Sequence, residues 1–241
     1  MVNISGCRMI RLEEYKHLLL KGDWHVHSNY VDGKSNISQL VRIAKKNNLK
    51  AIVIVEHVRK KMDYNFDLFL EEVNKFKNKY DIEIFSGVEA KVIDEKGNLD
   101  LPQKIWKDVD VVLAAFHSFK FPSSNFERNF KKYEKSLRGM LKNKKVNIWA
   151  HPFSQWYERL FLSKLNMFKL VEIIKKRVLI VEINLIKFFI PPTFLDHLIN
   201  ETNVLFSIGS DAHAAKEIWN GKKPTFINNY LWDKIQEKNL R

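Results

Sequence analysis

Short runs dominated by Val, Ile and Leu recur along the chain between residues 22 and 210. Each run is almost continuously apolar instead of alternating with polar residues, which is typical of parallel strands buried on both faces. The pattern therefore predicts seven strands, namely Gly22–Ser28, Leu49–His57, Ile82–Val88, Asp110–Ser118, Val146–His151, Val178–Leu185 and Val204–Ser210.

The stretches between these runs show the periodicity of amphipathic helices. The clearest apolar stripes lie in residues 40–44, 66–76, 126–141 and 165–174, and the first of them follows Ser35–Asn36, which can cap a helix. Repeated strand–helix alternation predicts an α/β domain with right-handed crossovers. Seven strands with outer helices favour a TIM-type barrel that is short by one unit, and a doubly wound open sheet is the competing architecture.

Two segments fall outside this alternation. Residues 91–101, which contain Gly97-Asn98, predict a small hairpin after the third strand. Residues 1–21 form an N-terminal lead before the single domain at 22–241, and Arg11–Leu20 has helical character. This lead either covers the bottom of the barrel or mediates dimerisation, and the sequence does not choose between the two.

Composition limits the class of protein. The chain has 241 residues, of which 45% are hydrophobic, and no apolar run approaches the length of a membrane span. We therefore expect neither a membrane partner nor a secretory signal. The single cysteine, Cys7, excludes an internal disulfide and fits a reducing, cytoplasmic location.

The net charge is +13, from 41 Lys and Arg against 28 Asp and Glu. Such a charge is compatible with a nucleic-acid partner, with acidic substrates, or with solvated lysines on every helix.

The candidate chemistry lies where the predicted strands end. Of the eight histidines, His17 and His197 stand in helical contexts and are taken as structural. The other six histidines and three carboxylates stand at strand ends or in the loops that follow them: His25, His27, Asp32, His57, Glu89, His117, His151, Asp211 and His213.

In parallel α/β folds the carboxyl ends of the strands meet on one face, so these residues are expected to converge on one rim. His25 and His27 point to the same side of their strand because side chains alternate with period 2, and Asp211 and His213 repeat this spacing. Any one such histidine is more often a hydrogen-bonded core residue than a ligand. A core does not bury so many polar groups without a partner, however, and divalent cations are suitable partners. The pattern predicts a multinuclear metal site.

Taken in order, the motifs around these residues resemble those of the PHP (polymerase and histidinol phosphatase) superfamily over roughly residues 22–215. Minor departures are Val31, where Ser is frequent, and Glu56, where Asp is usual. The motifs are Asp23-Trp24-His25-Val26-His27-Ser28 with Asp32-Gly33, Glu56-His57, Gly87-Val88-Glu89, Phe116-His117, Ala150-His151-Pro152, Glu182-Ile183-Asn184 and Ser210-Asp211-Ala212-His213.

The resemblance implies a distorted (β/α)7 barrel with two to three divalent metal ions. It assigns a first ion to His25, His27, Glu89 and Asp211, and a second to Glu89, His117 and His151. A third ion would take Asp32, His57 and His213. Mixed imidazole and carboxylate ligands fit Zn, Mn or Fe better than Mg, which prefers oxygen.

A cluster of divalent ions suits phosphoester hydrolysis by a metal-bridging hydroxide, with no side-chain nucleophile. We expect a phosphatase acting on a small phosphorylated substrate, as in histidinol-phosphatase-like relatives. A nuclease or nucleotide phosphoesterase acting on nucleic-acid ends is the alternative, and a non-catalytic scaffold is disfavoured because the ligand set is complete. Arg59 and Lys120 lie on the predicted rim, where they either contact the substrate phosphate or are solvated loop charges.

The densest basic run is a predicted helix over residues 127–145. Its cationic stripe is expected to face solvent on the outer ring, away from the rim, with its aromatic residues on the opposite, core face. Tracks for single-stranded nucleic acid usually interleave exposed aromatic residues with basic ones, so this arrangement weakens the nuclease alternative. The stripe comprises Arg128, Lys131, Lys135, Arg138 and Lys142, and the opposite face Phe126, Phe130, Tyr133, Leu137 and Leu141.

Overall fold

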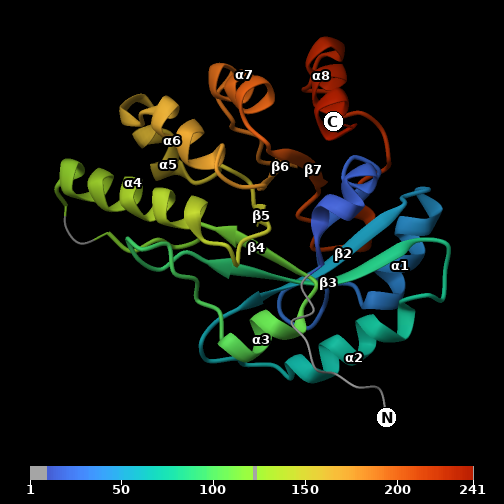
Figure 1. The fold of residues 1–241 in the computed structure, drawn as a ribbon. Helices are drawn as coiled ribbons and strands as arrows, with labels where there is room; N and C mark the ends of the chain where they lie inside the picture. The colour runs from blue at the N-terminus through green and yellow to red at the C-terminus, as the bar shows by residue number, and fades with distance from the viewer. Residues whose placement is uncertain (1–9, 122–123, 241) are drawn as a thin grey trace.

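The computed structural model describes residues 10–121 and 124–240, and its core is one parallel sheet in which the strands follow each other in chain order (Figure 1). All seven predicted strands are confirmed, with ends that differ by up to three residues. The strands are β1 Gly22–His27, β2 Ala51–Val58, β3 Glu83–Lys91, β4 Val111–Ala115, β5 Ile148–Trp149, β6 Ile180–Asn184 and β7 Leu205–Gly209. Cys7 lies outside the described residues.

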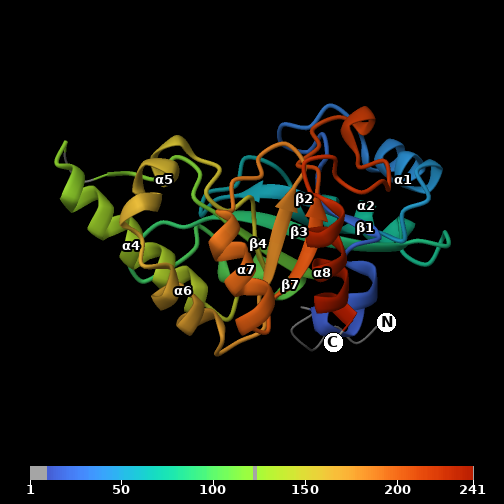
Figure 2. The ribbon, with the colours of Figure 1, turned by 90° about the horizontal axis from the view of Figure 1, so that it is seen from above.

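Helices alternate with the strands and cover the outside of the sheet. The four predicted stripes correspond to α1, α2, α4 and α6, and α1 begins with a capping box between Asn36 and Gln39. The helical elements are η1 Leu12–Leu18, α1 Ile37–Lys46, α2 Phe66–Phe76, α3 Gln103–Asp108, α4 Phe126–Lys142, α5 Trp156–Phe161, η2 Leu162–Lys164, α6 Met167–Ile174, α7 Pro192–Glu201, η3 Ala215–Glu217 and α8 Asn229–Leu240. Figure 2 shows α4 to α7 grouped on one side of the sheet and α1 and α2 on the other. None of the helices in the described part of the chain is long and apolar enough to cross a bilayer.

The first and last strands close the sheet into a barrel. The His27 N–H donates to the Ala212 carbonyl oxygen at 2.8 Å, and Val26 and Ala212 form a parallel bridge. Asp23 reinforces the seam, because its buried carboxylate accepts hydrogen bonds from the backbone N–H groups of Ser210 and Trp219, both at 3.0 Å. The expected seven-stranded barrel is confirmed, and the competing open, doubly wound sheet is wrong because β1 meets β7.

Two apolar layers hold this barrel together. The larger packs the outer face of the strands against the helices, and the smaller fills the barrel interior at its amino-terminal end. Trp24 and Phe85 stack in the smaller layer with their ring centroids 5.5 Å apart. The interior is therefore apolar below, which leaves the carboxyl-terminal end for polar chemistry.

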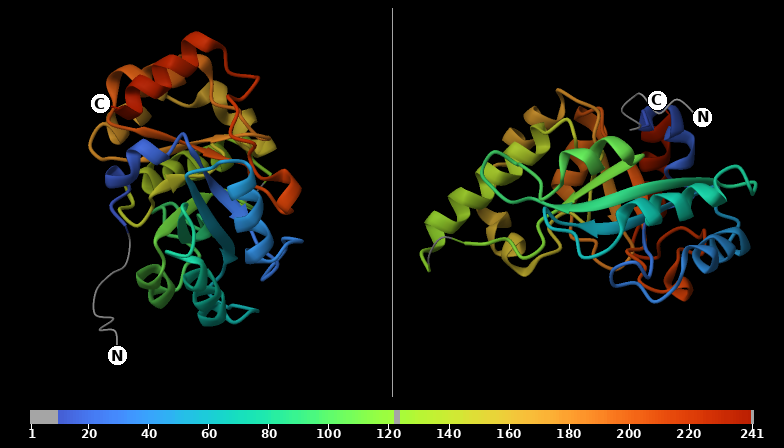
Figure 3. Two further views of the ribbon diagram at one scale, coloured as in Figure 1. Left: turned by 90° about the vertical axis from the view of Figure 1, so that its right-hand side faces the viewer. Right: turned by 90° about the horizontal axis from the view of Figure 1, so that it is seen from below.

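The described part of the N-terminal lead closes the bottom of the barrel. Leu12 and the fully buried Leu19 join the smaller layer, and the Tyr15 ring meets Phe85 edge-on at 5.0 Å. Figure 3 shows η1 beside α8, where the Lys16 ammonium donates to the Leu240 carbonyl oxygen at 3.4 Å. Of the two expected roles, residues 10–20 adopt that of a cover. The domain division at residue 21 stays a prediction.

Two further expectations concern the surface. The hairpin in 91–101 forms, with an antiparallel bridge between Val92 and Leu99 and a left-handed Gly97 at φ 74°. The cationic stripe of α4 faces solvent or is half-buried, as expected. One detail is wrong: Phe126 is 42% exposed, since it starts the helix beyond the core and packs only its edge on Phe161.

Leu19→Ala tests the cover. The side chain is fully buried, so its truncation is expected to lower the free energy of unfolding by about 2–5 kcal/mol. The matched control is Leu68→Ala, because Leu68 is 51% exposed on α2 and its truncation should cost less than about 0.5 kcal/mol. Urea unfolding of the purified proteins measures both. Equal stabilities of the two variants would show that η1 does not seal the barrel.

Candidate metal centre

A bulge in β1 points two histidines into the barrel. Asp23 pairs with Ile52 and Val26 with Ile54, so β1 carries one residue more than β2 across this step. The insertion allows Trp24 to fill the lower interior while His25 and His27 both occupy the upper interior, fully buried. Their Nε2 atoms are 3.1 Å apart.

Glu89, near the end of β3, lies at the centre of the cluster. Its side chain is buried, and its Oε1 lies 2.7 Å from His117 Nε2 and 2.8 Å from His151 Nε2. Its Oε2 lies 3.1 Å from His57 Nδ1 and 3.5 Å from the Nε2 atoms of both His25 and His27. One carboxylate thus contacts five imidazoles that come from four strands.

Two aspartates complete the cluster at different depths. Asp211 is buried, and its Oδ1 lies 3.6 Å from His25 Nε2 and 3.5 Å from His27 Nε2. Asp32 is 44% exposed, and its Oδ2 lies 3.3 Å from His57 Nε2 and 3.6 Å from His213 Nε2. The site therefore runs from a buried floor to an open mouth.

All nine side chains singled out in the sequence converge here. Their donor atoms form three overlapping groups that could each hold an ion: His25, His27 and Asp211; His25, Glu89 and His151; and His27, Asp32, His57 and His213. The grouping matches the expected division in outline. The difference is that His25 and His27 each border two groups, because they lie between Glu89 and the aspartates.

The cluster fits a divalent cation better than it fits its own hydrogen bonds. Of the buried polar atoms in the described residues, His27 Nδ1 and Glu89 Oε2 have no hydrogen-bond partner, although both lie in the site. Ligands about 2.0–2.2 Å from one ion lie roughly 3–3.5 Å apart, which is the spacing found among these donor atoms. Orphaned buried donors and acceptors are costly unless a bound group satisfies them.

The charge states also suit ligation. Burial would raise the pKa of Glu89, but the surrounding histidines, His117 and His25 foremost, hold it well below its ordinary value. Burial lowers the pKa of His27 to about 4, which keeps this ring neutral at pH 7. A carboxylate and a neutral imidazole are the forms that bind metals.

The backbone is strained beside several of these residues. His151 has φ 28°, Asp211 has φ 54° and Ser118, next to His117, has φ 46°. Non-glycine residues rarely adopt positive φ, and such strain gathers at functional sites. Here it turns side chains at the ends of β4, β5 and β7 back over the barrel mouth.

Sequence reasoning noticed Glu182 in β6 but gave it no role. Its buried Oε1 lies 2.8 Å from His25 Nδ1, and its Oε2 accepts a hydrogen bond from the backbone N–H of His151. A Cβ at Gly209 on β7 would lie 1.8 Å from Glu182 Oε1, so the glycine makes room for this carboxylate. A partner on Nδ1 fixes the tautomer and the ring, and leaves Nε2 to face the ions.

A cavity of about 270 Å³ opens on the cluster, and cations stand in its wall. Arg59 and Lys91 line it together with Asp32, His57, Glu89 and His117. The expected Arg59 is thus at the site, whereas Lys120 lines a neighbouring cavity. Sequence reasoning missed Lys91 and also Lys187, whose Nζ lies 2.6 Å from Asp211 Oδ2. Both follow strand ends, which is the signal that identified Arg59 and Lys120.

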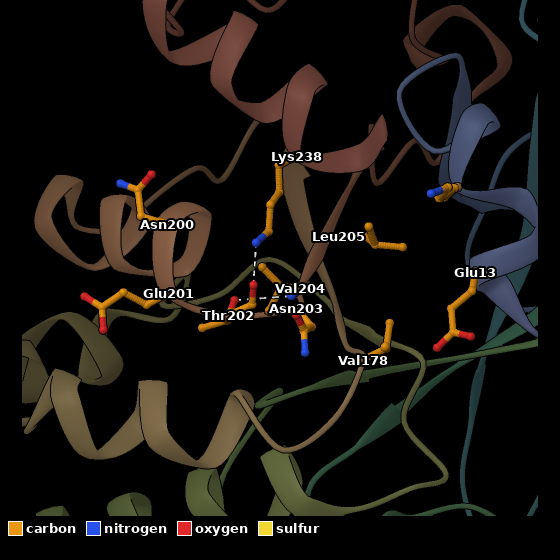
Figure 4. Close-up of a pocket in the computed structure, with 10 residues that line it drawn as sticks. Glu13, Val178, Asn200, Glu201, Thr202, Asn203, Val204, Leu205 and Lys238 are labelled. Carbon is orange, nitrogen blue, oxygen red and sulfur yellow. Dashed lines mark hydrogen bonds between the residues drawn. The ribbon is translucent and has the colours of Figure 1, made fainter. Parts of the chain in front are cut away.

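A larger cavity of about 570 Å³ lies at the other end of the barrel. It is walled by Glu13 of η1, by residues 200–205 before and within β7, and by Lys238 of α8, whose ammonium bonds the Thr202 carbonyl oxygen (Figure 4). None of the nine predicted ligands is in its wall. His17 is exposed and His197 half-buried, both away from the cluster.

Comparison with known proteins agrees with this geometry. The chain matches the PHP domain family over residues 23–184. It belongs to the PHP domain family. The match covers β1 to β6, and the β7 residues Asp211 and His213 join the site outside it.

Similar proteins include a probable phosphatase of Thermoanaerobacter sp. (strain X514), 32% identical over 158 residues, which span 63% of this chain and 63% of that relative. The chain thus spans less than two thirds of this curated relative. The DNA polymerase/3′-5′ exonuclease PolX of Bacillus subtilis (strain 168) is 27% identical over 213 residues, 80% of this chain and 34% of PolX.

A solved structure shares the fold. Histidinol phosphate phosphatase from Lactococcus lactis, complexed with Zn, L-histidinol and phosphate, has a TM-score of 0.57 and 18% identity over 91% of this chain and 92% of that one. At this identity the likeness shows the barrel fold alone.

Glu182→Gln tests the positioning of His25. The amide presents an N–H or a weaker acceptor to Nδ1, so the affinity for Zn²⁺ or Mn²⁺ is expected to fall about 10–100-fold, as is usual for a lost partner of a metal-binding histidine. Gly209→Ala should act in the same direction, because the added Cβ displaces the carboxylate. Competition with a metallochromic chelator measures the affinity, and Glu71→Gln on the exposed face of α2 is the control. Unchanged affinity in both variants would contradict this role for Glu182.

Proposed function

We propose that this protein is a metal-dependent phosphatase that removes phosphate from a small phosphomonoester. The observation that carries the proposal is the buried Glu89 carboxylate among five imidazoles, with an orphaned oxygen facing the cluster. Without cations such a group is costly to bury, and with them it becomes a bridging ligand. The family membership and the probable phosphatases among the relatives support the same activity.

The nine predicted residues form the ligand set in this proposal, at a centre of two to three ions of Zn, Mn or Fe. Such ions supply a nucleophile from water at neutral pH and offset the charge of the phosphate oxygens. Glu89 joins the groups because its two oxygens face different histidines. Glu182 and Gly209 hold the His25 ring in place.

Cationic side chains orient the substrate around this centre. Arg59 and Lys91 line the cavity that opens on His57 and His117, where they can bond the phosphate oxygens directly. Lys187 is held at Asp211 on the other side of the mouth, so its ammonium is anchored beside the ligands. No side-chain nucleophile is required, since the attacking oxygen comes from water.

The small-molecule substrate is favoured by the site itself, because a cavity of about 270 Å³ suits a compact phosphoester. That the phosphatase of similar fold holds L-histidinol and phosphate makes histidinol phosphate a reasonable first substrate to assay. The nuclease alternative has the PolX relative in its favour, and oligonucleotides belong in the same assay.

His25→Ala tests the proposed activity. Loss of a buried ligand shared by two groups is expected to lower phosphatase activity toward histidinol phosphate and nucleoside monophosphates by at least about 100-fold. Chelator treatment should abolish wild-type activity, and Mn²⁺ or Zn²⁺ should restore it. His17→Ala is the control, because His17 is exposed on η1. Wild-type protein that hydrolyses no monoester when loaded with metal, but cleaves oligonucleotides, would replace this proposal with the nuclease.

His213→Ala tests the number of ions. His213 belongs only to the outermost group, so its loss is expected to reduce bound metal from about three to about two ions per chain, without unfolding. Mass spectrometry of the metal content and circular dichroism measure the two quantities. One ion or fewer in the wild-type protein, or full activity in His57→Ala, would exclude a trinuclear centre.

A further inference from the structure

The cavity at the metal centre continues into a second one. The first, of about 270 Å³, and the second, of about 230 Å³, have Lys91 and Ser118 in both of their walls. The second cavity is also lined by Val92, Phe119 and Lys120. A molecule whose phosphate lies at the metal ligands can therefore extend past the end of β3 and β4 without leaving a walled channel.

Cations mark the length of this channel. Glu89 and Lys91 point to the same side of β3 because they are two residues apart, which places Lys91 about 7 Å further toward the mouth. Arg59 stands in the first cavity and Lys120 in the second, on either side of Lys91. Within the described residues, the side chains of Arg59, Lys91 and Lys120 form no ion pair.

Unpaired cations on both sides of a junction next to a hydrolytic site indicate more negative charge than one phosphate supplies. The metal ions and Arg59 suffice for the reacting phosphate, so Lys120 is left for another group. The carboxylates in the first cavity are the predicted ligands Asp32 and Glu89, and the second has none in its wall.

We propose that the substrate carries a second phosphate, which binds in the second cavity between Lys91 and Lys120 while the first is hydrolysed at the metal ligands. This inference rests on the proposed phosphatase function. The second phosphate does not react: water adds to the reacting phosphorus, the ester P–O bond breaks, and the leaving alcohol takes the proton.

The second phosphate can belong to a small bisphosphate or to the next residue of a nucleic-acid end. A third cavity of about 440 Å³ separates these sources, because it shares Ile93 with the second and is lined by Lys60, Lys96, Lys142 and Lys145. A small bisphosphate is too short to reach it, whereas an oligonucleotide could follow it onto the end of α4.

The test compares kcat/KM for a nucleoside 3′,5′-bisphosphate and for the matching 5′-monophosphate with metal-loaded protein. We expect a preference for the bisphosphate of about tenfold or more, the range of one charge-assisted contact. Lys120→Ala should remove this preference and leave monophosphate hydrolysis within about twofold. Lys46→Ala, at an exposed position in the last turn of α1, should change neither.

A 5′-phosphorylated trinucleotide tells the two sources apart. If it is cleaved best and Lys142→Ala lowers that rate alone, the second phosphate belongs to a nucleic-acid end. If the bisphosphate is preferred and Lys142→Ala changes nothing, it belongs to a small molecule.

Calorimetric binding of the bisphosphate to wild-type and Lys120→Ala protein gives a readout independent of turnover. Equal rates and equal affinities for mono- and bisphosphate would overturn the second site and leave the phosphatase intact. Lys120-dependent binding without hydrolysis of any monoester would do the reverse, since the second site would stand and the proposed activity would fall.

Discussion

The structure depends on one buried carboxylate. Glu89 lies inside a closed barrel, where a lone negative charge is strongly unfavourable, and it is tolerated because imidazoles from β1, β2 and the ends of β4 and β5 surround it. Those rings hold the pKa of Glu89 well below its usual range against the effect of burial. The same arrangement leaves Glu89 Oε2 and His27 Nδ1 without partners, so the polar cluster is complete only with cations present.

The rest of the barrel serves this cluster. Its lower interior is a dry apolar layer sealed by η1, and this layer supplies the packing that the polar upper half lacks. The seam through Asp23 closes β1 onto β7 and so brings His25 within reach of Asp211. The bulge in β1 and the positive φ at His151 and Asp211 then aim the side chains, which is where strain is usually found in enzymes.

The strands were predictable because parallel strands buried on both faces leave continuous apolar runs in the sequence. The convergence of the nine residues followed from the shared geometry of strand ends. Closure of the sheet did not, because it depends on hydrogen bonds between Asp23 and residues almost 200 positions away. The contact between Glu182 and Gly209 was equally hidden, since a glycine's role as empty space appears only when the facing side chain is placed.

The charge of +13 also gained a location that the sequence did not provide. Much of it lies on the solvent face of α4, as expected, but Lys91 and Lys120 line cavities that lead away from the cluster. The short helices α3 and α5 were not predicted, because six residues are too few to show a periodic stripe.

The most direct test of the central claim is a crystal structure of the manganese-loaded protein with inorganic phosphate, with the ions located by their anomalous scattering. We expect at least two ions, one on each side of Glu89, about 2.0–2.3 Å from its oxygens, with the phosphate between them and Arg59. Ions bound elsewhere, or a phosphate held only by surface lysines while Glu89 still contacts only its histidines, would contradict a metal-dependent phosphatase centred on this carboxylate.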